Sequence, residues 1–337
     1  MRVLVSTSAR YLDHDAGRGH PERPARLDAV LLGVNRAGVS DALVRVEPRP
    51  ASRDELELLH PPEYLDALEQ FCRQGGGHID PDTAAVPESW DAALLAAGAG
   101  PDAVERLERG EADSAFLALR PPGHHATPTR PMGFCLINNV AVTAAGLAAR
   151  GERVAVLDWD AHHGNGTQDA FYADGRVLYV SLHEFPLYPF TGRLAETGAG
   201  AGAGTTLNLP MPAGATGDVY LRALDEVVGP AIEAFMPSWL LVSAGFDGHR
   251  ADPLTDLGLS AGDFGDITAD LVQLAPAGRR VLFLEGGYDI DALRLSSAAT
   301  LGALVGEKRH EERPTGGGPG EDMVCAAMVA HRRAVLG

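Results

Sequence analysis

Short runs that are apolar at every position alternate along this chain with longer amphipathic stretches, and this alternation limits the fold most strongly. Strands that are apolar throughout are typical of parallel sheets, because helices cover both faces of such sheets. The amphipathic stretches would form the helical crossovers that parallel strands require. We therefore predict an α/β fold with a mostly parallel sheet, with strands at Val3–Ser6, Ala115–Leu119, Val154–Asp158, Val177–Leu182, Thr206–Leu209, Trp239–Ser243 and Val281–Leu284.

The same patterning predicts the helices and the domain organisation. Pro230 lies inside one amphipathic stretch, and because proline removes a backbone donor we expect it to kink or split that helix. No linker rich in proline, glycine or serine divides the chain midway, so we expect one domain over residues 1–337. The tract Glu307–Asp322 is expected to be a surface loop before a final helix. The other predicted helices include Arg23–Ala37, Pro62–Arg73, Ser89–Arg109, Asn139–Arg150, Asp218–Phe235, Ala261–Leu274 and Ile290–Val305.

Charge and composition exclude several classes of protein. The chain has 28 lysine and arginine residues against 46 aspartate and glutamate residues, a formal net charge of −18, so direct nucleic-acid binding is not expected. Its three cysteines are too few and too far apart for a disulfide framework or a zinc finger. The N-terminus does not have the pattern of a signal peptide, and no apolar run approaches the roughly 18 residues of a membrane span. We expect a cytoplasmic protein without membrane association; homo-oligomer formation stays open.

Polar and glycine-rich segments follow five of the predicted strands. In open α/β sheets the ligand crevice lies beyond the carboxyl ends of the strands. We therefore expect a functional site where these ends meet. The segments are RPPGHHA (120–126), WDAHHGNGT (159–167), His183, AGFDGH (244–249) and EGGY (285–288).

Asp160 and His162 have the spacing of two metal ligands. They follow a strand two residues apart, and on an extended backbone such side chains point to the same side. Asp247, after another strand, would supply a third donor, and three protein ligands with an open position are typical of a catalytic zinc site. One nitrogen and two oxygens form a harder set than zinc usually has, so ferrous iron is a second candidate. The alternative is that Asp160 and His162 only cap the next helix.

His124 and His125 lie in a loop stiffened by two prolines, where a histidine near a metal site can move protons. Asp158 and Asn165 are candidates to orient them. A carboxylate favours the imidazolium form more than an amide does, so the two histidines could differ in protonation. Tyr288, after two glycines, could donate a hydrogen bond to a developing oxyanion. The plainer alternatives are loop histidines without a role and a tyrosine that only packs.

Eight segments together resemble the histone deacetylase family and its relatives, the acetylpolyamine amidohydrolases and acetoin-utilisation proteins. They occur in the family's order over most of the chain. The run HHGNG is similar to the class II branch of the family, so the resemblance is to a class II-like bacterial deacetylase. The segments are HPERP (20–24), RPPGHHA (120–126), GFCLINN (133–139), DWDAHHGNGTQ (158–168), SLH (181–183), SAGFD (243–247), DPL (252–254) and EGGY (285–288).

The resemblance implies a single-domain arginase–deacetylase fold with a central, mostly parallel sheet of about eight strands flanked by helices. It also implies the catalytic roles. Zinc would be bound by Asp160, His162 and Asp247, and Tyr288 would polarise the acetyl carbonyl. His125 would act as general base and then general acid, with His124 as its electrostatic partner. By the same analogy, Asp158 orients His124, and Asn165 lies beside His125.

Further site residues come from the resemblance alone. A monovalent ion, potassium or sodium, would be held by Asp158, Ser181, Leu182 and the backbone of Asp160 and His162. Phe190 stands where the family usually has glycine, a departure expected to narrow or reshape the rim. Arg26 corresponds to an arginine near an internal acetate channel. The residues expected to bind substrate are Gly123, Phe134, Tyr188, Leu254 and, at the rim, Asp82.

The resemblance predicts a zinc-dependent amidohydrolase that removes acetyl or other acyl groups from N-acetylated amines, foremost acetyl-lysine in proteins or peptides. An acetylpolyamine amidohydrolase is the alternative. In the polyamine-selective branch a glutamate can follow the Asp-Pro pair, whereas here Leu254 does, which favours acetyl-lysine. The rim acids Asp80, Asp82 and Glu88 could still favour a polyamine. A non-catalytic acetyl-amine binding protein is a remoter alternative, and closure of the 184–204 loop over the tunnel stays open.

Overall fold

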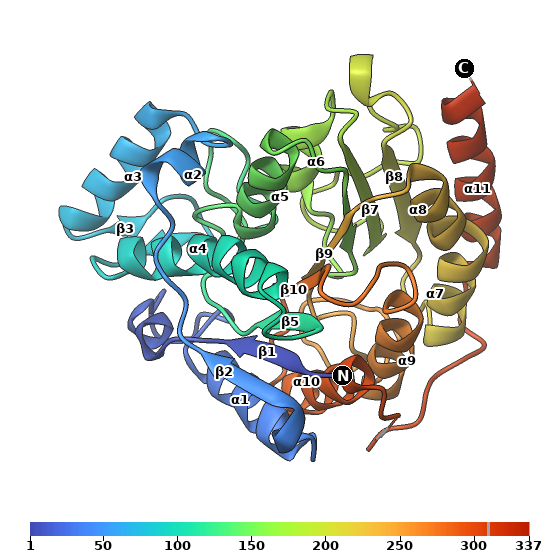
Figure 1. The fold of residues 1–337 in the computed structure, drawn as a ribbon, viewed down its shortest axis with the longest axis horizontal. Coiled ribbons are helices and arrows are strands. Elements are labelled where there is room, and N and C mark those ends of the chain that lie inside the picture. The colour runs from blue at the N-terminus through green and yellow to red at the C-terminus, as the bar shows by residue number, and fades with distance from the viewer. Residues whose placement is uncertain (309–310, 337) are drawn as a thin grey trace.

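A computed structural model describes residues 1–308 and 311–336 of the chain. Its centre is an eight-stranded sheet in the order β2-β1-β5-β10-β9-β6-β7-β8, and every neighbouring pair is parallel. Helices α4 and α5 lie on one side of the sheet and α1, α9 and α10 on the other (Figure 1). The predicted α/β fold with a parallel sheet of about eight strands is confirmed. The strands are β1 (Val3–Ser6), β2 (Leu43–Val46), β5 (Ser114–Leu117), β6 (Val154–Asp158), β7 (Val177–Glu184), β8 (Thr206–Met211), β9 (Trp239–Ala244) and β10 (Arg280–Leu284).

All seven predicted strands are present, with some ends shifted, while two features were not predicted. Strand β2 lies at an edge of the sheet and its residues are partly exposed, so it lacks a continuous apolar run. A short antiparallel hairpin, β3 (Gly77–His78) with β4 (Ala84–Ala85), is too brief for a period-2 pattern to appear. This hairpin matters because Asp80 and Asp82 lie in its turn.

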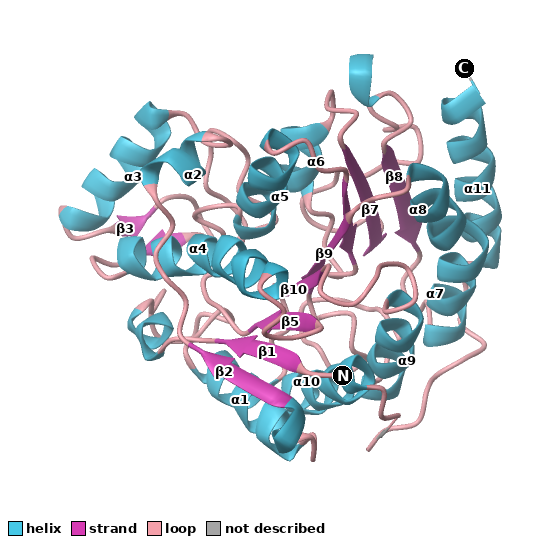
Figure 2. Ribbon diagram, in the orientation of Figure 1, coloured by secondary structure: helices cyan, strands magenta, loops and turns pink. Residues whose placement is uncertain are grey.

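The predicted helices are all present to within a few residues (Figure 2), while the short helices α2 (Arg53–Glu57) and α6 (Asn165–Phe171) were not predicted. Pro230 interrupts its helix as expected. Helix α7 ends at Ala223, a π-helical turn spans Leu224–Val228, and α8 follows with Pro230 as its second residue; the π-turn accommodates the missing N–H of the proline. The helices are α1 (Ala25–Arg36), α2 (Arg53–Glu57), α3 (Pro62–Arg73), α4 (Ser89–Glu108), α5 (Asn139–Ala149), α6 (Asn165–Phe171), α7 (Gly217–Ala223), α8 (Gly229–Phe235), α9 (Ala261–Leu271), α10 (Ile290–Val305) and α11 (Glu321–Leu336).

Burial explains why the strands read as apolar throughout. Strands β5, β6, β9 and β10 are buried at every position, as expected for a sheet covered by helices on both faces. Within residues 1–308 and 311–336, no helix has both the length and the apolar composition needed to cross a membrane. The tract expected as a loop before the final helix ends two residues earlier than predicted, because α11 begins at Glu321; residues 309–310 of that tract lie outside the described residues.

Candidate active site

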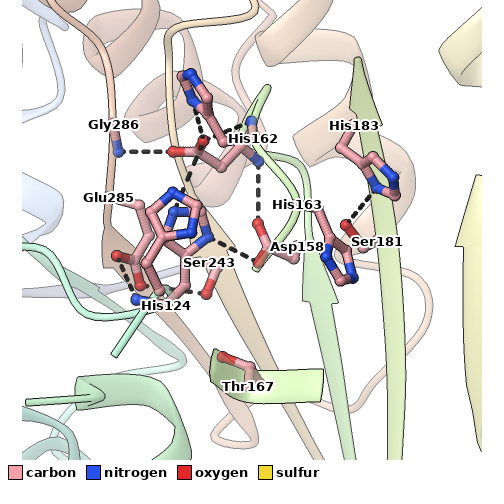
Figure 3. Close-up of polar contacts among 12 residues, drawn as sticks. His124, Asp158, His162, His163, Thr167, Ser181, His183, Ser243, Glu285 and Gly286 are labelled. Carbon is pink, nitrogen blue, oxygen red and sulfur yellow. Dashed lines mark hydrogen bonds and ion pairs between the residues drawn. The ribbon is translucent and has the colours of Figure 1, made fainter. Parts of the chain in front are cut away.

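The predicted site residues gather at the carboxyl ends of the central strands. Asp158 is the last residue of β6, and in register it lies beside Ser181 of β7 and Ser243 of β9. The histidine loop after β5 reaches the same edge, as do the segments after β9 and β10 (Figure 3). The parallel arrangement therefore brings together residues that lie more than 100 positions apart in sequence.

Asp160, His162 and Asp247 form a compact, buried cluster of donor atoms. One donor atom from each residue lies within 4.8 Å of the others. The His162 Nδ1 atom is 3.0 Å from an Asp247 oxygen and 3.2 Å from an Asp160 oxygen. Backbone amides hold the outer oxygens: Gly286 donates to Asp160 at 2.7 Å and Ala161 to Asp247 at 2.8 Å. The carboxylates are thus fixed with their inner oxygens toward His162.

The electrostatics of this cluster fit a bound cation. Burial would lower the pKa of His162, but Asp160 and Asp247 outweigh burial and raise it to about 10. Burial, together with the charge of Asp160, raises the pKa of Asp247 to about 7. Two buried carboxylates therefore attract positive charge to this point, and a divalent ion would satisfy both. Two oxygens and one imidazole nitrogen suit zinc or ferrous iron.

His124 and His125 are adjacent but have different partners. His124 Nδ1 lies 3.0 Å from an Asp158 oxygen, and His125 Nδ1 lies 2.8 Å from the Asn165 amide oxygen. Burial opposes a charge on His124, but Asp158, Asp160 and Glu285 outweigh it and raise its pKa well above the ordinary value. Burial, with the charges of His124 and His162, lowers the pKa of His125 well below its ordinary value. Near neutral pH, His124 is therefore the charged member of the pair and His125 the neutral one.

Glu285 supports the histidine loop and was not predicted as a site residue. One oxygen of its fully buried carboxyl group accepts the amides of Gly123, at 2.7 Å, and His124, at 3.2 Å. The other oxygen accepts the Ser243 hydroxyl at 3.2 Å, a contact that Figure 3 shows. Burial raises its pKa to about 7, although the charge of His124 opposes this. The available signal was an acidic residue placed directly after an apolar strand.

A cavity of about 230 Å³ leads to the metal-ligand cluster. The His125 ring lies 5.2 Å from the Tyr188 ring, and the Phe134 ring lies 5.8 Å from the Tyr288 ring. The predicted substrate residues Asp82, Phe134, Tyr188 and Leu254 all reach this cavity. Its lining consists of Asp82, His125, Gly133, Phe134, His162, Leu187, Tyr188, Leu254 and Tyr288.

Gly133, and not Gly123, is the glycine that lines the cavity, which corrects the prediction. Gly123 is buried and does not line the cavity, and a Cβ atom there would lie 2.5 Å from the Asn139 amide nitrogen. Gly133 has a φ of +57°, and a Cβ atom there would lie 2.4 Å from the His125 ring. Only glycine fits between this backbone and the histidine. Sequence position alone could not show which of the two glycines faces the cavity.

Phe134 is held from behind by the HPERP segment and the hairpin. The His20 ring meets it edge to face at 4.7 Å, and the Thr83 hydroxyl accepts its amide at 3.2 Å. Phe190, expected to narrow the rim, does not line the cavity and is 66% exposed. Its backbone has a φ of +66° in a turn closed by a 2.7 Å bond from its amide to the Leu187 carbonyl. That turn leaves the Phe190 side chain in solvent.

Comparison with known proteins decides the family. The sequence profile of the histone deacetylase domain matches residues 20–304. The chain belongs to the histone deacetylase family. A protein of Archaeoglobus fulgidus named "Probable deacetylase" is 41% identical over 303 residues, covering 88% of this chain and 84% of that protein. The "Histone deacetylase-like amidohydrolase" of Pseudomonas aeruginosa is 37% identical over 311 residues, covering 90% and 82% respectively.

A solved structure has the same fold. The crystal structure of the HDA15 HD domain superposes with a TM-score of 0.90 at 34% identity, covering 98% of this chain and 96% of that one. The chain therefore has the arginase–deacetylase fold, as expected. The two relatives described above are a deacetylase and an amidohydrolase by name, and membership of the histone deacetylase family supports a hydrolase.

Two further expectations from the resemblance concern Arg26, near an internal acetate channel, and the residues around a monovalent ion. Arg26 is buried with its guanidinium 5.0 Å from the centre of the Tyr288 ring, and it donates to the carbonyls of Glu285 and Gly287. Asp158 lies beside Ser181 in register, and buried Leu182 follows in β7. The Asp158 carboxylate also accepts the Asp160 amide at 3.1 Å. The residues expected around a monovalent ion are thus neighbours.

Proposed function

We propose that this protein is a zinc-dependent deacetylase that hydrolyses the acetyl-lysine amide of proteins or peptides. The observation that carries the proposal is a cavity that ends at a buried cluster of three metal-ligating groups. His125 and Tyr288 stand on the walls of that same cavity. A reactive amide at its end would therefore meet a proton acceptor and a hydroxyl donor together.

Asp160, His162 and Asp247 would hold the ion. When bound, a divalent ion supplies Lewis-acid polarisation of the amide carbonyl and lowers the pKa of water. Ferrous iron would satisfy the same donors, so the proposal for zinc rests on the family and on the ligand number. The carboxylate oxygens are already oriented by the amides of Gly286 and Ala161, so the protein is preorganised to bind the ion.

His125 would act first as general base and then as general acid. An amide oxygen only accepts hydrogen bonds, so the contact with Asn165 places the ring proton of His125 on Nδ1. The Nε2 lone pair is then available to take a proton from the attacking water. The C–N bond breaks as that proton passes to the leaving nitrogen, which gives acetate and a free amine. Positively charged His124 beside it stabilises the negative charge that develops on the substrate.

Tyr288 would donate a hydrogen bond to the developing oxyanion. Burial, together with Asp247 and Asp160, raises the pKa of its hydroxyl well above the ordinary value, although Arg26 opposes this. The phenol therefore keeps its proton at neutral pH and acts as a donor. Such a donor commonly contributes about 100- to 1,000-fold to kcat.

The walls of the cavity favour acetyl-lysine as the substrate. Phe134 and Tyr188 present aromatic surface suited to a linear methylene chain, and Leu254 places an apolar side chain at the rim. N-acetylated polyamines are the second candidate, because Asp82 lines the same cavity and would attract their additional cations. Leu254 offers no such attraction, which is why we place acetyl-lysine first.

The experiment is a side-by-side measurement of acetate release from an acetyl-lysine peptide and from N-acetylputrescine. It uses zinc-loaded protein, with Tyr288→Phe as the control. Peptide turnover that falls about 100-fold or more in the control would support the proposal. Preference for N-acetylputrescine would keep the chemistry and overturn the substrate class. Turnover of neither substrate by zinc-loaded protein would overturn the proposed function.

A further inference from the structure

A polar strap, residues 311–320, follows helix α10 and ties together elements around the active site. The Ser260 hydroxyl, at the start of α9, donates to the Arg313 carbonyl at 2.9 Å. The Thr315 hydroxyl donates to Asp263 in α9 at 2.7 Å, and the Gly317 amide donates to Asp218 in α7 at 2.8 Å. The strap lies beyond residues 20–304, the range that matches the histone deacetylase domain.

Glu312 is the strap residue that reaches the active-site loops. One of its carboxylate oxygens accepts His249 Nε2 at 2.7 Å and the Ala261 amide at 3.0 Å, and the other accepts Arg250 at 3.0 Å. The Ala251 amide donates to His249 Nδ1 at 3.1 Å, so the proton of the neutral ring lies on Nε2 and points at Glu312. The His249 side chain is only 3% exposed, so Nε2 depends on Glu312 for an acceptor.

The turn that begins at His249 leads to the proposed oxyanion donor. The Asp252 amide donates to the His249 carbonyl at 2.8 Å. One oxygen of Asp252 then accepts the backbone amide of Tyr288 at 2.6 Å, and the other accepts the Leu254 amide at 3.0 Å. The same turn therefore connects the metal-ligand segment at Asp247, the rim residue Leu254 and the backbone of Tyr288.

We propose that Glu312 is a positioning residue for Tyr288. Glu312 fixes His249, and His249 fixes the turn that carries Asp252. Asp252 then holds the backbone amide of Tyr288. The inference rests on the proposed function for the importance of Tyr288. Without Glu312, a buried N–H of His249 has no acceptor, and the turn gains freedom to move until that group is hydrated. Displacement of a positioned group by about 1 Å can cost about 100-fold in rate.

Hydrogen exchange on the full-length, zinc-loaded protein tests the structural part without any need for turnover. Glu312→Ala should speed amide exchange in peptides that cover 247–254 and 286–289. The matched control is Glu311→Ala, which removes an exposed carboxylate on the same strap whose contact is an ion pair with Arg294 at 3.5 Å. Exchange in Glu312→Ala that equals exchange in the control would overturn the proposal. Glu312→Asp, which withdraws the carboxylate by one methylene, gives the same comparison if the alanine variant does not fold.

Kinetics with an acetyl-lysine peptide test the positioning role. Glu312→Ala should lower kcat about 10- to 100-fold with KM changed less than about threefold, and it should cost little more in a Tyr288→Phe background. Glu312→Gln should recover most of kcat, because its amide oxygen can still accept from His249 and Ala261. An equal loss in both backgrounds, or no recovery with glutamine, would overturn the proposal. If wild-type protein turns over neither acetyl-lysine nor acetylputrescine, the proposed function fails, and the exchange result still decides whether Glu312 holds the turn.

Discussion

The His124 and His125 rings lie 4.1 Å apart between their centres, yet one faces the Asp158 carboxylate and the other the Asn165 amide. A carboxylate stabilises the imidazolium form, whereas an amide oxygen adds no charge. Their pKa values consequently move in opposite directions, upward for His124 and downward for His125. This difference in partner leaves a charged histidine beside a neutral one.

Asn165→Asp should raise the pKa of His125, because it places a carboxylate where the wild-type protein has an amide. A general base must be unprotonated, and burial together with neighbouring His124 lowers the pKa of wild-type His125 well below its ordinary value. With the pKa of His125 raised, kcat/KM of the variant should fall more steeply than that of the wild type as the pH is lowered from 8 to 6. The measurement is a pH profile of peptide turnover, with Asn165→Ala as the uncharged control. Profiles of the same shape for aspartate and alanine would contradict this assignment.

Glu285→Gln should stabilise the protein at alkaline pH. The folded-state pKa of Glu285 is about 7, above the ordinary 4.5, so the folded state holds this proton more tightly than the unfolded chain. Stability from this group is therefore present below about pH 4.5 and is lost as the pH rises through about 7. Glutamine does not ionise and keeps an oxygen for the Gly123 and His124 amides, so the variant should gain about 1–3 kcal/mol at pH 8.

Chemical denaturation of wild type and Glu285→Gln at about pH 5 and pH 8 checks this expectation. Glu311→Gln, on the exposed part of the strap, is the control. The difference in the free energy of unfolding should be larger at pH 8. A difference of equal size at both pH values would show that ionisation of the Glu285 carboxyl does not destabilise the folded protein.

Leu254→Glu should shift the preference toward N-acetylputrescine. Leu254 lines the cavity and is 38% exposed, so a carboxylate there could meet the second amine of the polyamine. The ratio of kcat/KM values, polyamine over peptide, should rise about two- to fivefold, as for an exposed ion pair worth up to about 1 kcal/mol. Leu254→Gln changes shape without charge and should move the ratio less. An unchanged ratio in the glutamate variant would remove Leu254 from the determinants of specificity.

Phe190→Gly should leave the protein as stable or stabilise it by up to about 1 kcal/mol, because a left-handed backbone costs about 1–2 kcal/mol for residues with a Cβ atom. The Phe190 side chain is 66% exposed and contributes little burial to offset that cost. Phe134 has the same φ of +66° but forms a wall of the cavity, so Phe134→Gly should raise KM for the peptide. The test measures the thermal unfolding temperature and the KM for the peptide of both variants. A rise in KM for Phe190→Gly as large as for Phe134→Gly would place Phe190 at the substrate.

Two members of the metal-ligand cluster could be predicted from local sequence because they are near neighbours along the chain. Asp160 and His162 follow an apolar strand with a spacing of two, and a parallel sheet brings the end of β9 to the same edge. Glu285 also follows an apolar strand, but its support of the histidine loop could not be predicted in the same way, since its amide partner Gly123 is 162 positions away. The choice between Gly123 and Gly133 likewise depends on the position of the His125 ring in space.

Long-range support for the site was the part that local patterns could not show. Glu312 lies 63 positions from His249, in a tract that reads as an undistinguished polar loop. His20 was noted only as part of a motif, although its ring supports Phe134. Strand β2 was not predicted, for a different reason. It is a partly exposed edge strand, so it lacks the apolar run that marks the central strands.

Removal and restoration of the metal test the central claim most directly. Acetate release from an acetyl-lysine peptide is measured for the protein as purified, after chelation, and after addition of zinc, together with the bound zinc per chain. The account predicts that activity disappears with chelation, returns with about one zinc per chain, and does not return in Asp247→Asn, which weakens the ligand set. Full activity in the chelated, zinc-free protein, or in Asp247→Asn without bound metal, would contradict it.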